Sequence, residues 1–238
     1  MITSGVRIEA RGLTKSFGQV RAVDELSFTI EPGAVTGFLG PNGAGKTTTL
    51  RMLLGLIRPD AGTATFGERL YADLREPART VGAALDATGF HPARSGRDHL
   101  RVYCVVNGFP RSRADDVLDL VGLSEVASRP VKGYSLGMRQ RLALATALLG
   151  DPAVLVLDEP ANGLDPEGIA WMRGLLRDMA DRGRTVLVSS HLLWEIQQVV
   201  DQVVILSNSR LVHHGELAGL ARGYDSLEAA FFALTGGR

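Results

Sequence analysis

The chain has little of what would place it outside a reducing compartment or inside a membrane. Cys104 is the single cysteine among 238 residues, which rules out an intramolecular disulfide and a cysteine-based zinc site. The first ten residues include Arg7 and Glu9 and lack the apolar core of a signal peptide, and no later stretch approaches ~18 uninterrupted apolar residues. These absences predict a cytoplasmic protein that reaches a membrane only through a partner.

Net charge is also absent. Lys plus Arg and Asp plus Glu both total 26, so the formal charge is zero. A neutral chain has no overall field that attracts the phosphate backbone, and we therefore expect no nucleic-acid partner. The hydrophobic content of 45% over 238 residues is enough for a sizeable core in a single domain.

Short apolar segments alternate with helical patterns along most of the chain. Expected strands occupy residues 6–13, 26–30, 35–39, 81–85, 154–157, 185–188 and 202–206. Expected helices occupy residues 46–56, 166–182, 192–200 and 226–235, and helical spacing dominates from about residue 95 to 149. The alternation predicts a parallel sheet with helices on both faces, interrupted by a mostly helical insertion.

A glycine-rich loop connects the strand expected at 35–39 to the helix expected from residue 46. Its sequence is Gly40-Pro41-Asn42-Gly43-Ala44-Gly45-Lys46-Thr47, followed by Thr48. This fits the phosphate-binding loop pattern, in the strand-to-helix context that the pattern requires. Backbone N–H groups of such a loop turn toward phosphate oxygens, and the helix N-terminus adds partial positive charge. We expect Lys46 to reach the terminal phosphates and the Thr47 hydroxyl to bind magnesium.

Two adjacent carboxylates, Asp158 and Glu159, follow the apolar run at 154–157. The carboxyl ends of parallel strands form the sheet edge at which ligands bind. Asp158 is suited to hold magnesium through water, and Glu159 to polarise the water that attacks the γ-phosphate. An acidic pair at a strand end is, on its own, more often a solvated turn. The phosphate loop favours the catalytic interpretation.

Together these motifs resemble the ATP-binding cassette (ABC) family, over about residues 8–215. The resemblance implies an α/β fold: a P-loop NTPase core with a mainly parallel sheet, an N-terminal antiparallel β portion and an inserted helical subdomain. Residues 1–238 would form one ABC ATPase domain. Its nucleotide-binding core would consist of residues 1–86 and 151–238, and residues 87–150 would form the helical subdomain that ends in the signature helix.

The segment from Tyr134 to Arg141 is similar to the family signature, with Leu136 where glycine is usual and Met138 where glutamine is usual. In the family this segment contacts the γ-phosphate bound by the other subunit, which implies that role for Ser135 and Gly137. Ser135 at a helix start could instead be only an N-cap.

Three further segments match the family pattern. Residues 162–166 resemble the dimer-contact loop, and His191, after the strand expected at 185–188, resembles the histidine that contacts the γ-phosphate. An isolated histidine after a strand is more often structural. Phe17 occupies the place of the aromatic residue that stacks on adenine, although phenylalanine is also commonly buried in a core.

Asp86 departs from the usual family pattern. It follows the strand expected at 81–85, where the family has a glutamine that contacts magnesium and the attacking water. An acidic residue here is similar to the antibiotic and multidrug exporter subfamily. We expect Asp86 to sense magnesium from the side opposite Asp158.

The resemblance therefore implies a Mg²⁺-dependent ATPase that binds ATP, pairs with a second ATP-binding subunit and energises export of a drug, antibiotic or lipid-like compound. A separately encoded integral membrane subunit would hold it at the cytoplasmic face. Three alternatives remain open at this point: an importer subunit, a soluble ABC ATPase that acts on nucleic acid or ribosomes, and an inactive half of a heterodimer.

Overall fold

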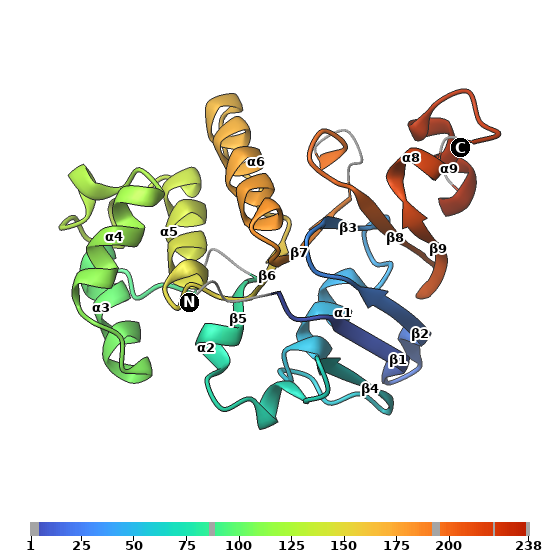
Figure 1. The fold of residues 1–238 in the computed structure, drawn as a ribbon, viewed down its shortest axis with the longest axis horizontal. Helices are drawn as coiled ribbons and strands as arrows, with labels where there is room; N and C mark the ends of the chain where they lie inside the picture. The colour runs from blue at the N-terminus through green and yellow to red at the C-terminus, as the bar shows by residue number, and fades with distance from the viewer. Residues whose placement is uncertain (1–4, 86–88, 192–195, 221, 237–238) are drawn as a thin grey trace.

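The computed structural model describes residues 5–85, 89–191, 196–220 and 222–236, and it contains two sheets (Figure 1). The smaller sheet is antiparallel, in the order β2 (Val20–Ile30), β1 (Ile8–Phe17), β4 (Ala61–Phe66). The larger sheet has the order β5 (Val81–Ala84), β6 (Val154–Asp158), β7 (Thr185–Ser190), β3 (Val35–Leu39), β8 (Gln202–Ser207), β9 (Arg210–Glu216). Its neighbouring strands run parallel except for β9, which is antiparallel to β8. The predicted α/β fold class is confirmed.

The central strands are buried on both faces, which is why their sequences are almost continuously apolar. Every residue of β3, β6 and β7 is buried. Successive side chains still divide between two cores, as the period of a strand requires: Leu155 and Leu157 lie in one cluster, whereas Val154 and Val156 lie in the other. The larger sheet is therefore the middle layer of the molecule.

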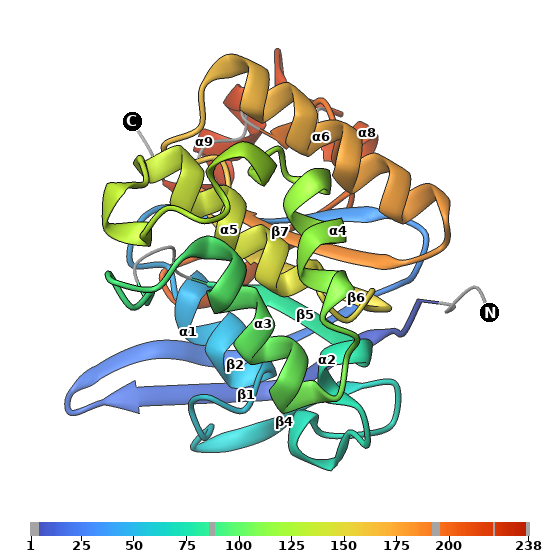
Figure 2. The same cartoon turned by 90° about the vertical axis from the view of Figure 1, so that its left-hand side faces the viewer.

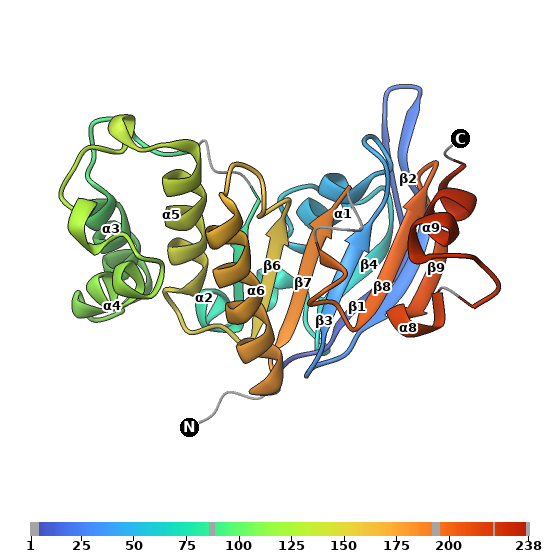
Figure 3. The same cartoon turned by 90° about the horizontal axis from the view of Figure 1, so that it is seen from above.

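One core lies between the larger sheet and the antiparallel sheet, with α1 (Lys46–Leu53) packed against both. The rings of Phe28 in β2 and Phe38 in β3 are 5.4 Å apart and join the two sheets directly. Figure 3 shows α1, β1, β2 and β4 together on this side of β3. The antiparallel sheet thus holds the helix that follows the glycine-rich loop.

The opposite face of the larger sheet is covered by α6 (Pro166–Asp181), which buries Met172, Leu176 and Met179 against it. Of the short helices, α2 (Pro77–Thr80) precedes β5 and contacts it, whereas α8 (Leu217–Leu220) and α9 (Leu227–Thr235) follow β9 and pack on the β8–β9 end of the sheet. Short 3₁₀ turns occupy Tyr71–Asp73, Ser124–Val126 and Val131–Gly133.

The expected helical insertion contains α3 (Gly96–Asn107), α4 (Ser112–Leu120) and α5 (Leu136–Leu148), which lie together at one end of the molecule (Figure 1), the end that faces the viewer in Figure 2. α5 packs on β5 at the edge of the larger sheet and also contacts α3 and α4. Cys104 is fully buried in this region, where burial raises the pKa of its thiol.

Several boundaries differ from the sequence predictions. β1 extends to Phe17, and α1 ends at Leu53, just before Gly55 with φ 67°. β4 was not predicted, because its sequence AGTATF begins with alanine and glycine, which strands disfavour, and it forms through pairing with β1. The helix expected at 192–200 lies partly outside the described residues. Within the described part of the chain, no helix is long and apolar enough to span a membrane.

Candidate nucleotide-binding site

The glycine-rich loop joins β3 to α1, as its sequence predicts. Gly45 has φ 99°, and a Cβ at this position would lie 2.3 Å from the carbonyl oxygen of Ala22 in β2. Only glycine avoids both the backbone strain and the collision. Pro41, Asn42 and Gly43 are exposed on the loop, while Ala44 is buried beneath it.

Lys46, the first residue of α1, has a buried side chain that curls back over the loop. Its Nζ donates hydrogen bonds to the carbonyl oxygens of Gly40 at 2.7 Å and Pro41 at 3.3 Å. Burial lowers the pKa of Lys46, while the carboxylates of Glu159 and Asp158 oppose that effect. The ammonium group thus lies at the centre of the loop, where an anion would meet it. Thr48 is half-buried in the same helical turn.

The ends of three parallel strands meet at this loop. The Thr47 hydroxyl donates to Asp158 Oδ2 at 2.6 Å, and Asp158 is only 9% exposed. Ser189 at the end of β7 donates its hydroxyl to Asp158 Oδ1 and accepts a hydrogen bond from the backbone N–H of Glu159 at 2.9 Å. Sequence reasoning missed Ser189, although Asp158 and Ser189 are register partners in neighbouring strands. A polar residue at the end of an apolar strand was the available signal.

Glu159 faces different neighbours from those of Asp158. Its Oε2 lies 2.8 Å from His191 Nδ1 and its Oε1 lies 3.6 Å from Lys46 Nζ. Its φ of 48° is a left-handed conformation that non-glycine residues seldom adopt. Such conformations cluster at functional sites, where the surrounding contacts hold them. The structure therefore brings Lys46, Thr47, Asp158, Glu159 and His191 together.

The signature segment lies elsewhere in the fold. Ser135 is the exposed N-cap of α5, and its Oγ accepts a hydrogen bond from the backbone N–H of Met138 at 3.2 Å. A Cβ on Gly137 would lie 2.8 Å from the Gly163 carbonyl oxygen, so the start of α5 packs closely on the expected dimer-contact loop. α5 lies against β5, whereas the phosphate loop follows β3, with β6 and β7 between these strands. One copy of the chain does not bring the two motifs together.

Phe17 lies at the outer end of β1 and is 50% exposed, so the alternative of a core residue is wrong. An exposed aromatic ring keeps a face free for stacking. Asp86, expected to sense magnesium, lies outside the described residues, and its role stays a prediction.

Comparisons with known proteins agree with this arrangement. The ABC transporter family model matches residues 23–162. The bacitracin transport ATP-binding protein of Bacillus licheniformis is 44% identical over 208 residues, covering 86% of this chain and 68% of that protein. The Nod factor export ATP-binding protein I of Ralstonia nicotianae is 38% identical over 216 residues, covering 88% of this chain and 67% of that protein. A solved ATP-binding subunit of an ABC transporter has a TM-score of 0.85 at 25% identity, covering 95% of this chain and 98% of that structure. The chain belongs to the ABC transporter family, as an ATP-binding subunit and an ATPase.

Proposed function

We propose that this subunit hydrolyses Mg²⁺-ATP in a dimer and thereby energises export through a separate integral membrane subunit, which it contacts from the cytoplasmic face. The observation that carries the proposal is the meeting of Lys46, Thr47, Asp158, Glu159 and His191 where β3, β6 and β7 end. A buried cation, an oxygen pair and a carboxylate–histidine pair in one place are the parts that phosphoryl transfer to water requires.

ATP binding is assigned to residues 40–48 and Phe17. The loop N–H groups and the N-terminus of α1 attract phosphate oxygens. Lys46 exchanges its hydrogen bonds to the Gly40 and Pro41 carbonyls for bonds to the terminal phosphates. Because its Nζ already lies at the loop, little reorganisation is needed. The exposed Phe17 ring stacks on the base.

The residues present fit a magnesium ion. Mg²⁺ prefers oxygen ligands and is usually bound by one or two protein groups together with substrate phosphates. The Thr47 hydroxyl and the Asp158 carboxylate, 2.6 Å apart, supply such oxygens beside the phosphate loop. When bound, the ion neutralises charge on the β- and γ-phosphates. Asp86 is assigned to the same ion, and Ser189 holds the second oxygen of Asp158.

Glu159 is assigned as the base that orients and deprotonates the attacking water. His191 contacts one carboxylate oxygen of Glu159 and Lys46 approaches the other, so the side chain is held from both sides. A held carboxylate accepts a proton without first reorganising. We also assign His191 as a hydrogen-bond donor to the γ-phosphate, the role implied by the family pattern.

The dimer is inferred from the separation of the two phosphate-binding motifs. Ser135 and Gly137 lie on the β5 side of the sheet, and the phosphate loop lies at β3. A two-fold axis would place the signature of one subunit over the phosphate loop of the other, forming two identical composite sites. We assign residues 1–86 and 151–238 to the nucleotide-binding core and residues 87–150 to the helical subdomain that carries the signature.

Export is supported by the name of one relative, the Nod factor export ATP-binding protein I, and a transport role by that of another, the bacitracin transport ATP-binding protein. The two names give different transported compounds. We therefore assign the direction and the membrane partner, and leave the transported class as drug, antibiotic or lipid-like compound.

The decisive experiment measures magnesium-dependent ATP hydrolysis against protein concentration, with the dimer fraction recorded at each point. A composite site predicts a rate per subunit that rises with the dimer fraction and is absent in Lys46→Ala. A constant rate per subunit in a monomeric sample would contradict the dimer. If the parent binds ATP but hydrolyses none with magnesium present and the dimer formed, hydrolysis by the dimer without its membrane subunit is contradicted.

A further inference from the structure

The tip of the β1–β2 hairpin, which carries Phe17, extends beyond the rest of its sheet. Pairing between β1 and β4 ends at Thr14 and Ala61, whereas pairing between β1 and β2 continues to Phe17 and Val20. Phe17 is 50% and Val20 67% exposed, so the tip buries little apolar surface of its own. A two-stranded ribbon is marginally stable in water, and this tip therefore needs other contacts to hold one geometry.

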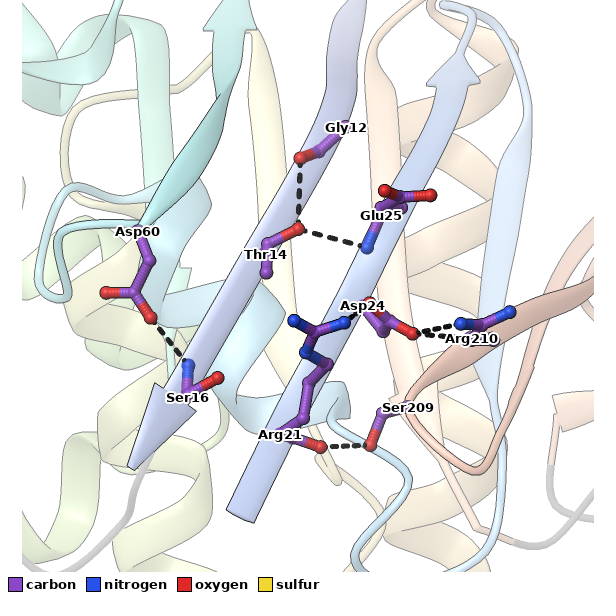
Figure 4. A network of polar contacts seen from close by, with 9 residues as sticks. All are labelled: Gly12, Thr14, Ser16, Arg21, Asp24, Glu25, Asp60, Ser209 and Arg210. Atoms are coloured by element: carbon purple, nitrogen blue, oxygen red, sulfur yellow. Dashed lines mark hydrogen bonds and ion pairs between the residues drawn. The ribbon is translucent and has the colours of Figure 1, made fainter. Parts of the chain in front are cut away.

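Asp60, the residue just before β4, supplies those contacts to three consecutive residues. Its backbone N–H donates to the Thr14 carbonyl oxygen at 2.8 Å. Its Oδ1 accepts from Lys15 Nζ at 2.8 Å, and its Oδ2 accepts from the backbone N–H of Ser16 at 2.7 Å. Figure 4 shows the Asp60 side chain reaching Ser16 from the neighbouring segment. The carboxylate thus continues the pairing where the β4 backbone no longer does.

Lys15 passes this restraint on to the aromatic ring. Its Nζ lies over the Phe17 ring, 5.6 Å from the centroid, while it is bound to Asp60. An ammonium group over a ring face is attracted by the ring's negative face. One face of Phe17 is therefore occupied by Lys15, and a base can stack only on the other.

We propose that Asp60 is a positioning residue for the nucleotide base: by holding Lys15 and the Ser16 backbone, it fixes the Phe17 ring in the orientation that stacks on the base. The inference rests on the proposed function, because it requires Phe17 to contact the base. Asp60 itself touches the protein and not the nucleotide.

The chemistry of the contact requires an ionised carboxylate. The hydrogen bond from Lys15 and the Ser16 N–H lower the pKa of Asp60, which stays charged at neutral pH. Asparagine would keep one acceptor oxygen for the Ser16 N–H but would lose the ion pair with Lys15. Alanine would lose both contacts. The two variants therefore separate the backbone restraint from the charge.

Equilibrium binding of ATP is measured without magnesium for the parent, Phe17→Ala, Asp60→Ala, Asp60→Asn and the double variant Phe17→Ala/Asp60→Ala. Inorganic triphosphate is the second probe, since it occupies the phosphate loop and carries no base. Glu9→Gln is the matched control, because Glu9 lies in β1, the strand of Phe17, and its carboxylate accepts a hydrogen bond from Arg11 at 2.9 Å. Thermal unfolding of each variant establishes that it is folded.

Loss of base stacking predicts an ATP affinity about 10-fold weaker in Phe17→Ala, with triphosphate affinity unchanged. Asp60→Ala should weaken ATP binding about 3- to 10-fold and Asp60→Asn less, again without an effect on triphosphate. Because Asp60 acts through Phe17, the double variant should bind ATP like Phe17→Ala alone.

Other results overturn the inference in distinguishable ways. If Phe17→Ala weakens ATP binding but Asp60→Ala behaves like Glu9→Gln, Asp60 does not position the ring. If Asp60→Ala weakens ATP and triphosphate equally, it acts on the fold as a whole. If Phe17→Ala binds ATP like the parent, stacking itself is wrong and the inference falls with it. A parent that binds neither probe contradicts the proposed nucleotide site.

Discussion

Glu159 divides its two carboxylate oxygens between His191 and the buried ammonium of Lys46, at 2.8 Å and 3.6 Å. The amide of glutamine has the same shape and can still contact His191, but it cannot accept a proton from water. General bases contribute roughly 10²- to 10⁴-fold to rate, so Glu159→Gln should lower kcat by about that factor. ATP affinity should stay equal or increase, because a negative charge near the γ-phosphate is removed. Single-turnover hydrolysis and equilibrium binding measure the two effects.

The control for this variant is Glu167→Gln, at an exposed glutamate in the first turn of α6. It should hydrolyse ATP like the parent. If Glu159→Gln hydrolysed ATP at the parent rate, a group other than Glu159 would have to be the base.

Ser135 has two possible roles, which one substitution separates. Aspartate is as good an N-cap as serine, so Ser135→Asp should leave the free energy of unfolding within about 0.5 kcal/mol of the parent. A carboxylate beside a bound γ-phosphate would repel it, and hydrolysis should fall at least about 10-fold.

Ser226→Asp is the matched control, because Ser226 caps α9 by accepting a hydrogen bond from the backbone N–H of Ala229, as Ser135 does from Met138. It should change neither property. If Ser135→Asp hydrolyses ATP like Ser226→Asp, Ser135 is an N-cap and nothing more.

At the scale of the element, α4 offers a direct test of what holds the helical region together. Leu118 is 1% exposed in the core shared with α3 and α5, whereas Leu120 in the same helix is 45% exposed. Truncating a fully buried leucine costs about 2–5 kcal/mol of unfolding free energy. Leu118→Ala should therefore lower the free energy of unfolding by an amount in that range. Leu120→Ala should leave it within about 0.5 kcal/mol of the parent. Equal losses in denaturant unfolding would contradict this packing.

Asp24 connects β2 to the β8–β9 turn. It is 7% exposed and accepts hydrogen bonds from Arg21 and Arg210, while Ser209 donates to the Arg21 carbonyl oxygen (Figure 4). Burial raises the pKa of Asp24, but the two guanidinium groups outweigh burial and lower it overall. The network holds β2, whose Ala22 lies against Gly45 of the phosphate loop.

A lowered pKa sets the sign of the pH dependence. The contribution of Asp24 to stability is fully present above its unfolded pKa of about 3.9 and is lost as pH falls through the folded value. Asp24→Asn should therefore be less stable than the parent at pH 7, and the difference should shrink as pH falls below about 4. Thermal unfolding of both proteins over this pH window is the measurement. A difference independent of pH would show that the carboxylate charge does not stabilise the fold.

The sequence allowed prediction of elements whose signals are local. The phosphate loop, the buried strands β3, β6 and β7 and the cap at Ser135 all depend on neighbours within a few residues. β4 depends on pairing with β1, and the contacts of Asp60 with Ser16 and of Asp24 with Arg210 join residues 44 and 186 positions apart. No local pattern encodes such contacts. Hydrophobicity alone also does not decide whether Phe17 lies in the core or at the surface, because its exposure depends on where β4 stops pairing with β1.

At the scale of the whole molecule, the phosphate loop and the signature are far apart in one subunit. The composite site can therefore be tested by mixing two variants, each defective in one of these motifs. Lys46→Ala removes the phosphate loop's cation, and Ser135→Asp damages the signature. In a homodimer of either variant both composite sites are defective. A mixed dimer contains one site with both defects and one with an intact loop and an intact signature.

Mixing the two impaired variants should therefore restore hydrolysis. With random pairing and independent sites, an equimolar mixture should reach about a quarter of the parent rate, because about half the dimers are mixed and each has one intact site. Mixing Lys46→Ala with Glu159→Gln is the control: both residues belong to the same half-site, so the mixed dimer has a defect in each site and should stay inactive. Restoration in the control as well as in the test pair would contradict the composite site. Differently tagged subunits establish that mixed dimers have formed. If the test pair still fails, either one subunit alone supplies both motifs to a site or each site hydrolyses ATP only when the other is intact.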